Sequence, residues 1–188
     1  YLIKEVSFGN DGNISQERLE DCINSDLANN YGNLCQRVTA FAIKNCDGKI
    51  PLEVKFNDED LLILNKYKDN LDNIRSQIDN QNINFYIDYI VNSLFEANKY
   101  FNDQEPWKKK DDIIRLNTIV YTTLEIVRKI SFLLYPIIPE SSLKALRIFN
   151  IKEKDIKLDT VSNNDYLKKG NDIHKIDILF KKIEKNND

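Results

Sequence analysis

Residues 25–45 read SDLANNYGNLCQRVTAFAIKN, and this stretch decides the fold. Its apolar side chains recur every three or four positions, at Leu27, Tyr31, Leu34, Val38, Phe41 and Ala42. That spacing places them on one face of an α-helix. Ser25 or Asp26 can begin the helix, and Asp47-Gly48 can end it, because glycine accepts the left-handed conformation of a helix cap. Since the apolar face must be covered, the stretch predicts a bundle of helices.

The same periodicity continues on both sides of this helix. Ser15 can cap a shorter helix that ends near Asn24. Asn57 is a strong helix start, because an Asn cap is followed there by three acidic residues that favour the positive end of the helix dipole. Helices are therefore expected over residues 57–79, 83–101, 107–135 and 139–149.

The two ends of the chain have other patterns. Tyr1 to Phe8 alternates and predicts a short strand, with a turn over residues 9–13. Beyond Asn150 the helical pattern weakens, and a turn at Gly170 precedes an alternating stretch, which predicts an extended or hairpin-like tail. The sequence thus predicts an all-α antiparallel bundle of about five helices, with a short N-terminal strand and an extended C-terminal tail.

Composition limits the classes of function. Of the 188 residues, 41% are hydrophobic and 30% are charged, as is ordinary for a globular protein. The formal net charge of −3 disfavours a non-specific nucleic-acid binder, which is usually basic. A bound nucleic acid must then be held by a local patch and by contacts to its bases. No stretch approaches the ~18 apolar residues of a membrane span.

The cysteines and the first residue add two expectations. Cys22, Cys35 and Cys46 form no CxxC pair, which disfavours a zinc site and a disulfide framework and fits a reducing cytoplasm. The chain begins with Tyr1 and contains no Met, so it is expected to be an excerpt of a longer protein.

No catalytic or metal-binding constellation is predicted. His174 is the only histidine, and we expect it to be exposed in the tail. No glycine-rich phosphate loop is present. The acidic runs at 58–60 and 111–112 stand at expected helix starts, where the helix dipole explains them.

Asn33 and Arg37 are the first candidates for recognition. They lie four residues apart and project from one face of the expected helix. An amide offers a donor and an acceptor, and a guanidinium offers a planar fork with positive charge, so the pair suits the edge of a base. Gly32 is unusual inside a helix, and a close approach by a ligand or a second backbone would explain it. The alternative is an ordinary solvated helix face.

Trp107 is the second candidate. It stands between Pro106 and the run Lys108-Lys109-Lys110. An exposed indole on a stiff proline turn can stack on a base, and the three lysines can contact phosphates. The alternative is a tryptophan buried in the core.

Five segments resemble the anticodon-binding domain of class I methionyl-tRNA synthetases. Residues 25–37 resemble its D-L-A-N-x-x-G-N-L-x-x-R stretch, and residues 8–15, FGNDGNIS, resemble F-G-x-D-G-x-F-S. Residues 103–108, DQEPWK, are similar to D-E-Q-x-P-W, and residues 135–140, YPIIPE, to L-x-P-F-M-P-E. Gly170 with residues 179–184, LFKKIE, resembles G…L-F-P-R-I-E. The similarity covers nearly the whole chain, with the segments in order.

The resemblance implies a function and an organisation. Asn33 and Arg37 would read the first anticodon base, a cytosine, and Trp107 would stack in the anticodon loop, with Pro106 shaping the turn. Residues 1–14 would end the segment that connects to a catalytic domain, residues 15–150 would form the anticodon-binding bundle, and residues 151–188 a tail that packs back toward the catalytic domain. The implied partners are tRNA(Met), with its CAU anticodon, and the catalytic domain of the same chain, with neither DNA nor a membrane.

The chemistry implied by the family lies outside these residues. The whole enzyme would attach methionine to tRNA using ATP with Mg²⁺, in a catalytic domain that also carries a zinc knuckle, while this part would hold no cofactor. Lys181-Lys182 stands where the family's tail has Pro-Arg, so this part of the tail departs from the family's pattern. Two alternatives stay open: the anticodon-binding domain of a related synthetase for Leu, Ile, Val or Cys, and a helical interaction module with no RNA role.

Overall fold

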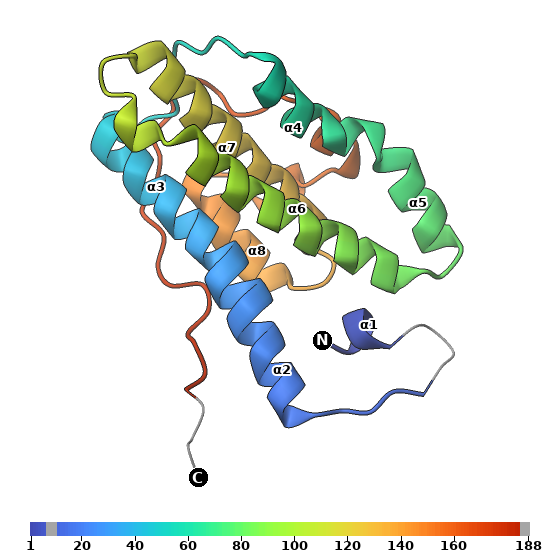
Figure 1. Cartoon of the computed structure of the whole chain (residues 1–188). Helices are drawn as coiled ribbons and strands as arrows, with labels where there is room; N and C mark the ends of the chain where they lie inside the picture. Colours follow the sequence, from blue (N-terminus) through green and yellow to red (C-terminus); the bar gives the residue numbers. More distant parts are fainter. Residues whose placement is uncertain (7–10, 185–188) are drawn as a thin grey trace.

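Helix α7, Ile113–Leu134, is the centre of the computed structural model, which describes residues 1–6 and 11–184 (Figure 1). Every residue from Thr118 to Leu134 is buried. Helices α3, α4, α6 and α8 all contact it. A helix that is buried on every side needs such a surround, and this explains the bundle that the sequence predicts.

The elements around α7 follow the predicted order. The helices are α1 Leu2–Glu5, α2 Gln16–Cys22, α3 Asn33–Asn45, α4 Asp58–Asp69, α5 Leu71–Asp79, α6 Ile83–Gln104 and α8 Pro139–Leu146. Short 3₁₀ turns are η2 Pro106–Lys108, η3 Arg147–Phe149, η4 Glu153–Asp155 and η5 Leu158–Ser162. Within residues 1–6 and 11–184 the only β-type pairing is an isolated bridge between Lys49 and Asp172. The prediction of an all-α bundle is confirmed.

The predicted N-terminal strand is wrong. Residues Leu2–Glu5 form one helical turn, α1, which packs against α6. The helical turn lets the Lys4 amine reach the Asp26 carboxylate at 2.6 Å, and no strand lies beside it in the part of the chain that the structure describes. Residues 7–10, which include the end of the predicted strand and the start of the predicted turn, lie outside the described residues.

Three predicted helix boundaries are also wrong. The helix expected over residues 57–79 is divided at Asn70 into α4 and α5. The two helices expected on either side of residue 25 form one continuous helix, because a π-helical segment, η1 (Ile23–Gly32), joins α2 to α3. The helix expected from Trp107 begins only at Ile113, since the Asp112 side chain caps it by accepting the Arg115 N–H at 2.9 Å. Pro106–Lys108 instead form a separate turn.

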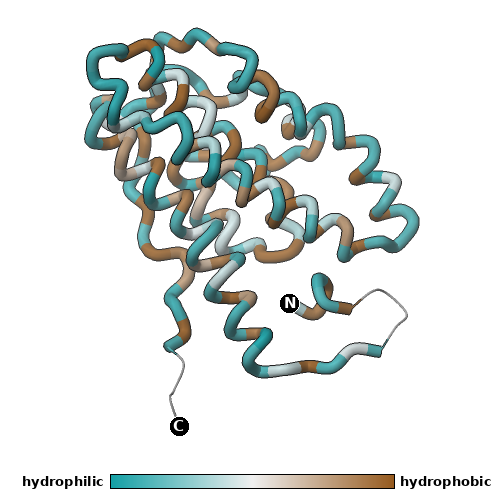
Figure 2. Tube along the Cα trace, viewed as in Figure 1, coloured by the Kyte–Doolittle hydropathy of each residue, from teal (hydrophilic) through white to brown (hydrophobic). Residues whose placement is uncertain are grey.

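Apolar residues gather where the helices face one another, as the alternation of colours along each helix in Figure 2 shows. The core includes the predicted inward residues Tyr31, Leu34, Val38 and Ala42, each 0% exposed. No helix in the described ranges is both long and apolar enough to cross a membrane.

The tail covers one side of α7 and is extended, with short turns. Val161, Leu167 and Ile173 of the tail are buried in the core. The Leu167 N–H donates to the Glu125 carboxylate of α7 at 2.6 Å. Figure 1 shows the tail passing behind the bundle and then descending beside α3 toward α2. The prediction of an extended tail is confirmed.

Three charged side chains of α7 lie beneath the tail. Glu125, Arg128 and Lys129 are all 0% exposed. Arg128 pairs with Glu125 at 2.7 Å and donates to the carbonyl oxygens of Thr160 and Asn163. The Lys129 amine donates to the Val161 carbonyl at 2.6 Å and to the Asn164 side chain at 2.8 Å. These side chains supply the hydrogen bonds that the irregular backbone of the tail requires.

Raising the pH from 7 to 9 is expected to stabilise the wild-type fold relative to Lys129→Met. Burial, with a smaller contribution from Arg128, lowers the pKa of Lys129 from its ordinary 10.5 to about 7. Between these values the unfolded chain binds more protons than the folded chain, so the free energy of unfolding rises with pH. The free energy of unfolding of the wild type is expected to rise by about 1 kcal/mol per pH unit more than that of Lys129→Met. Urea unfolding measures both. Identical pH dependences of the two proteins would contradict this prediction.

Candidate nucleic-acid interface

Arg37 lies on α3 and is held against α6. Its side chain is half-buried, and Nη2 donates to the Oδ1 atom of Asn102 at 2.6 Å. The guanidinium carbon lies 5.5 Å from the ring centroid of Phe101, close enough for a cation–π contact. Asn102 and Phe101 belong to the last two turns of α6. The direction of Arg37 is therefore set by a second helix.

Trp107 lies on the turn that follows α6. Glu105 has a left-handed backbone with φ of 44°, which ends α6 and turns the chain into η2. Pro106 is buried, whereas the Trp107 side chain is 40% exposed. The indole packs edge-on against Phe101, with the ring centroids 6.1 Å apart at 70°. The indole is thus held by a ring contact and remains partly open to solvent, as a stacking platform must be.

Phe101 brings the two candidates together. It is 2% exposed, and it contacts Arg37, Trp107 and also Phe41, whose ring centroid lies 5.9 Å away. The guanidinium and the indole therefore both contact one buried ring, although they are 70 residues apart in the sequence. Phe101 is a buried residue of α6, and no local signal in the sequence identifies it as the link.

Asn33 is the first residue of α3 and lies one turn before Arg37. Its side chain is half-buried and makes no hydrogen bond within residues 1–6 and 11–184. On the facing helix, Asn98 of α6 donates to the Asn30 side chain at 2.6 Å. No local pattern predicts this Asn30–Asn98 pair, since only the packing of α6 on η1 brings the two amides together.

Gly32 is explained by close packing within the protein. A Cβ atom at this position would lie 3.2 Å from the Leu27 carbonyl oxygen and 3.5 Å from Phe180 of the tail. The π-helical segment brings Leu27 near, and the tail covers the glycine. The neighbouring atoms are a carbonyl oxygen of the same helix and side chains of the tail, so the second backbone that the sequence suggested is not what lies against the glycine.

The three lysines after Trp107 are exposed. Lys108 forms an ion pair with Glu105 at 2.8 Å, and its side chain is 65% exposed. Asp111 and Asp112 follow directly, so the charge around the turn is mixed. His174, which the sequence predicts to be exposed, is exposed in the tail.

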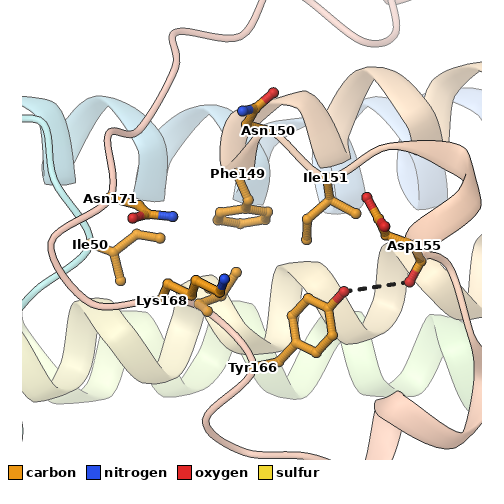
Figure 3. A pocket seen from close by; sticks show the side chains of 9 residues that line it. Ile50, Phe149, Asn150, Ile151, Asp155, Tyr166, Lys168 and Asn171 are labelled. Carbon is orange, nitrogen blue, oxygen red and sulfur yellow. Dashed lines mark hydrogen bonds between the residues drawn. The ribbon is translucent and has the colours of Figure 1, made fainter.

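A hollow lies elsewhere, between the tail and the turn that follows α8. It has a volume of about 400 Å³ and is lined by Ile50, Phe149, Asn150, Ile151, Asp155, Tyr166, Leu167, Lys168 and Asn171 (Figure 3). Its polar side chains are exposed or half-buried, and none of these lining residues has a buried polar atom without a partner. It includes none of the candidate recognition residues.

Curated proteins are similar to this chain over nearly its whole length. Residues 50–188 match the family model described as the anticodon binding domain of methionyl tRNA ligase. The methionine–tRNA ligase of Thermotoga maritima is 35% identical over 186 residues, which cover 98% of this chain and 29% of that protein. That of Rhizobium meliloti is 41% identical over 147 residues, or 78% of this chain and 28% of that protein. The family model includes Trp107, and the Thermotoga maritima match extends the similarity over Asn33 and Arg37.

Solved structures are similar over the same range. The apo form of Mycobacterium tuberculosis methionyl-tRNA synthetase has a TM-score of 0.91 at 33% identity, covering 98% of this chain and 38% of that one. The same enzyme bound by methionyl-adenylate has a TM-score of 0.89 at 34% identity, covering 96% of this chain and 36% of that one. The chain spans about 30% of the length of the curated relatives that it matches.

Proposed function

Because this chain belongs to the family of anticodon-binding domains of methionyl-tRNA ligases, we propose that it recognises the CAU anticodon of tRNA(Met). Asn33 and Arg37 read the edge of the first anticodon base, a cytosine. Trp107 stacks on a base of the loop, and Pro106 holds the turn that presents the indole. Lys108, Lys109 and Lys110 contact the phosphates.

One observation supports the proposal: Arg37 and Trp107 both pack on Phe101, and the Trp107 side chain is 40% exposed. RNA is commonly recognised in loops, where unstacked bases lie on aromatic side chains and form hydrogen bonds along their edges. An indole beside a guanidinium offers both contacts. The net charge of −3 is compatible with this reading because sequence information comes from the bases, while the phosphates need only the local lysines.

The proposal extends to the whole protein. This domain selects tRNA(Met) for a catalytic domain of the same chain, in which methionine is activated with ATP and Mg²⁺ and then attached to the tRNA. Zinc also belongs to that domain. We place the reaction in the cytoplasm, where the three free cysteines are stable. The tail, residues 151–188, packs back toward the catalytic domain.

Binding to anticodon stem-loops of different sequence tests the proposal. The domain is expected to bind a CAU loop more tightly than a loop in which the first anticodon base is changed to U, A or G. Tighter binding of a loop for Leu, Ile, Val or Cys would assign the domain to a related synthetase. No binding of any loop at low salt, where phosphate contacts are strongest, would favour an interaction module without an RNA role.

Arg37→Lys is expected to lower the preference for C over U at the first position about fivefold, or ~1 kcal/mol. Lysine keeps the positive charge and loses the planar fork of donors, so the affinity for phosphates is retained while the contact to the base edge is weakened. Fluorescence anisotropy with the two labelled loops measures the ratio. Arg75→Lys, on α5, is the matched control and should leave the ratio unchanged. An unchanged ratio in Arg37→Lys would remove Arg37 from base reading.

A further inference from the structure

Asp60, in the first turn of α4, is a fully buried carboxylate with four donors. Arg115 of α7 donates to both oxygens, from Nη1 at 2.6 Å and from Nη2 at 3.0 Å. The Asn57 N–H donates at 2.9 Å, and the Tyr100 hydroxyl of α6 completes the set. Burial, together with the hydrogen bond to Asp60, raises the pKa of Tyr100, which therefore stays a donor. The carboxylate thus joins the start of α4, the end of α6 and the first turns of α7.

Gln104 ties this cluster to the turn that carries Trp107. It is the last residue of α6, and its Oε1 atom accepts from Arg115 Nη2. Its Nε2 atom donates to Glu59 of α4 at 2.6 Å. The chain then reverses at Glu105, so Gln104 is the last fixed point before Pro106 and Trp107.

Arg115 also defines the far end of the same segment. Its own backbone N–H donates to the Asp112 side chain at 2.9 Å, which caps α7. Residues 105–112 are therefore fixed at one end by Gln104 and at the other end by Arg115. The Arg115 guanidinium also donates a hydrogen bond to the Gln104 side chain. A displacement of this guanidinium would move both ends of the segment relative to Phe101.

We propose that Asp60, Arg115 and Gln104 are positioning residues that hold the Trp107 indole in place for stacking on a base. The inference rests on the proposed RNA recognition. In the described residues, the hydrogen bond and ring contacts of Arg37 and Trp107 involve none of these three side chains, which act through the turn of residues 105–112. A buried ion pair by itself is weak evidence for stability, since its desolvation offsets much of its attraction. The contribution of the Asp60–Arg115 pair here is geometric, because it fixes the direction in which the chain leaves the end of α6.

The indole itself reports on this support, because Trp107 is the only tryptophan of the chain. Gln104→Met removes both hydrogen bonds of the amide, and Arg115→Lys keeps the charge but loses the fork that spans Asp60 and Gln104. Both variants are expected to red-shift the Trp107 emission and to lower its steady-state anisotropy, with the far-UV circular dichroism unchanged. Gln16→Met, on α2 at the opposite end of the molecule in Figure 1, is the matched control.

The affinity for the CAU stem-loop is a second measurement, and its dependence on Trp107 distinguishes positioning of the indole from a general effect on stability. Gln104→Met is expected to weaken binding about threefold in the wild-type background and not at all in the Trp107→Ala background, because the amide acts through the indole. Equal weakening in both backgrounds, or unaltered emission in both support variants, would overturn the inference. If Trp107→Ala and wild type bind the RNA equally, the proposed function fails, and the emission spectra still decide whether the cluster holds the indole.

Discussion

Replacing Glu125 by alanine is expected to lower the free energy of unfolding by about 3–5 kcal/mol. Glu125 and Arg128 are both 0% exposed, and their charged groups lie 2.7 Å apart. Removing the carboxylate leaves the guanidinium inside the protein without its counter-ion, and a buried, uncompensated charge is the costly state. Urea unfolding followed by circular dichroism measures the loss as a lower midpoint at unchanged slope.

The same substitution is expected to loosen the tail before the bundle. The second Glu125 oxygen accepts the Leu167 N–H at 2.6 Å, and Arg128 holds the carbonyl oxygens of Thr160 and Asn163. Without the carboxylate, the arginine loses the partner that orients it toward the tail. Amide hydrogen exchange is expected to speed up in residues 158–167 while α6 stays protected.

Asp159→Ala is the matched control for Glu125→Ala. Like Glu125, Asp159 pairs with an arginine, Arg75. Asp159 lies in the tail, and its side chain is 86% exposed while that of Arg75 is 44% exposed. An exposed pair contributes about 0–1 kcal/mol. Losses of similar, small size in the two variants would show that the Glu125–Arg128 pair behaves as a surface pair.

The helices were largely predictable because their apolar residues follow the helical period. Leu34, Val38 and Ala42 are fully buried on α3, as their spacing indicates. The burial of α7 on all sides was harder to foresee, because Arg128 and Lys129 resemble a solvated face in the sequence. Both side chains also donate to backbone oxygens more than thirty residues away. No local sequence pattern predicts that the tail supplies these oxygens.

Two of the wrong predictions followed local sequence preferences that the packing of the fold overrides. Tyr1 to Val6 has the alternation of a strand, but α1 packs on α6 and its Lys4 pairs with Asp26, so a helical turn forms instead. The π-helical segment joins two helices where Ser25 and Asp26 suggested a new start. Tertiary packing outweighs the local preference in both cases.

The candidate site divides in the same way. The motif around Asn33 and Arg37 and the Pro106-Trp107 pair could be identified in the sequence, by chemistry and by resemblance. Their proximity could not, because it depends on Phe101, which α6 inserts between them. The support beneath Trp107 was equally hidden, since Asp60 reads as a helix cap until Arg115 is placed beside it.

Replacing Trp107 by alanine is expected to weaken binding of the CAU stem-loop by about 1–3 kcal/mol, or about five- to 150-fold. The indole is 40% exposed and its ring is held against Phe101, so it offers a base a surface that is already oriented. Such an orientation lowers the entropy lost on binding. Phe95→Ala removes an exposed aromatic ring of α6 that is 52% accessible and lies beside Lys66, Phe85 and Tyr89, and it should leave the affinity unchanged.

The salt dependence of binding separates stacking from charge in the Trp107→Ala variant. The slope of log K against log salt counts the phosphate contacts that lysine and arginine neutralise. The indole is uncharged, so its loss should lower the affinity by the same factor at every salt concentration and leave the slope unchanged. A variant with a shallower slope would have displaced Lys108, Lys109 or Lys110, and its weaker binding would then reflect lost phosphate contacts. A parallel line at lower affinity is the result that stacking requires.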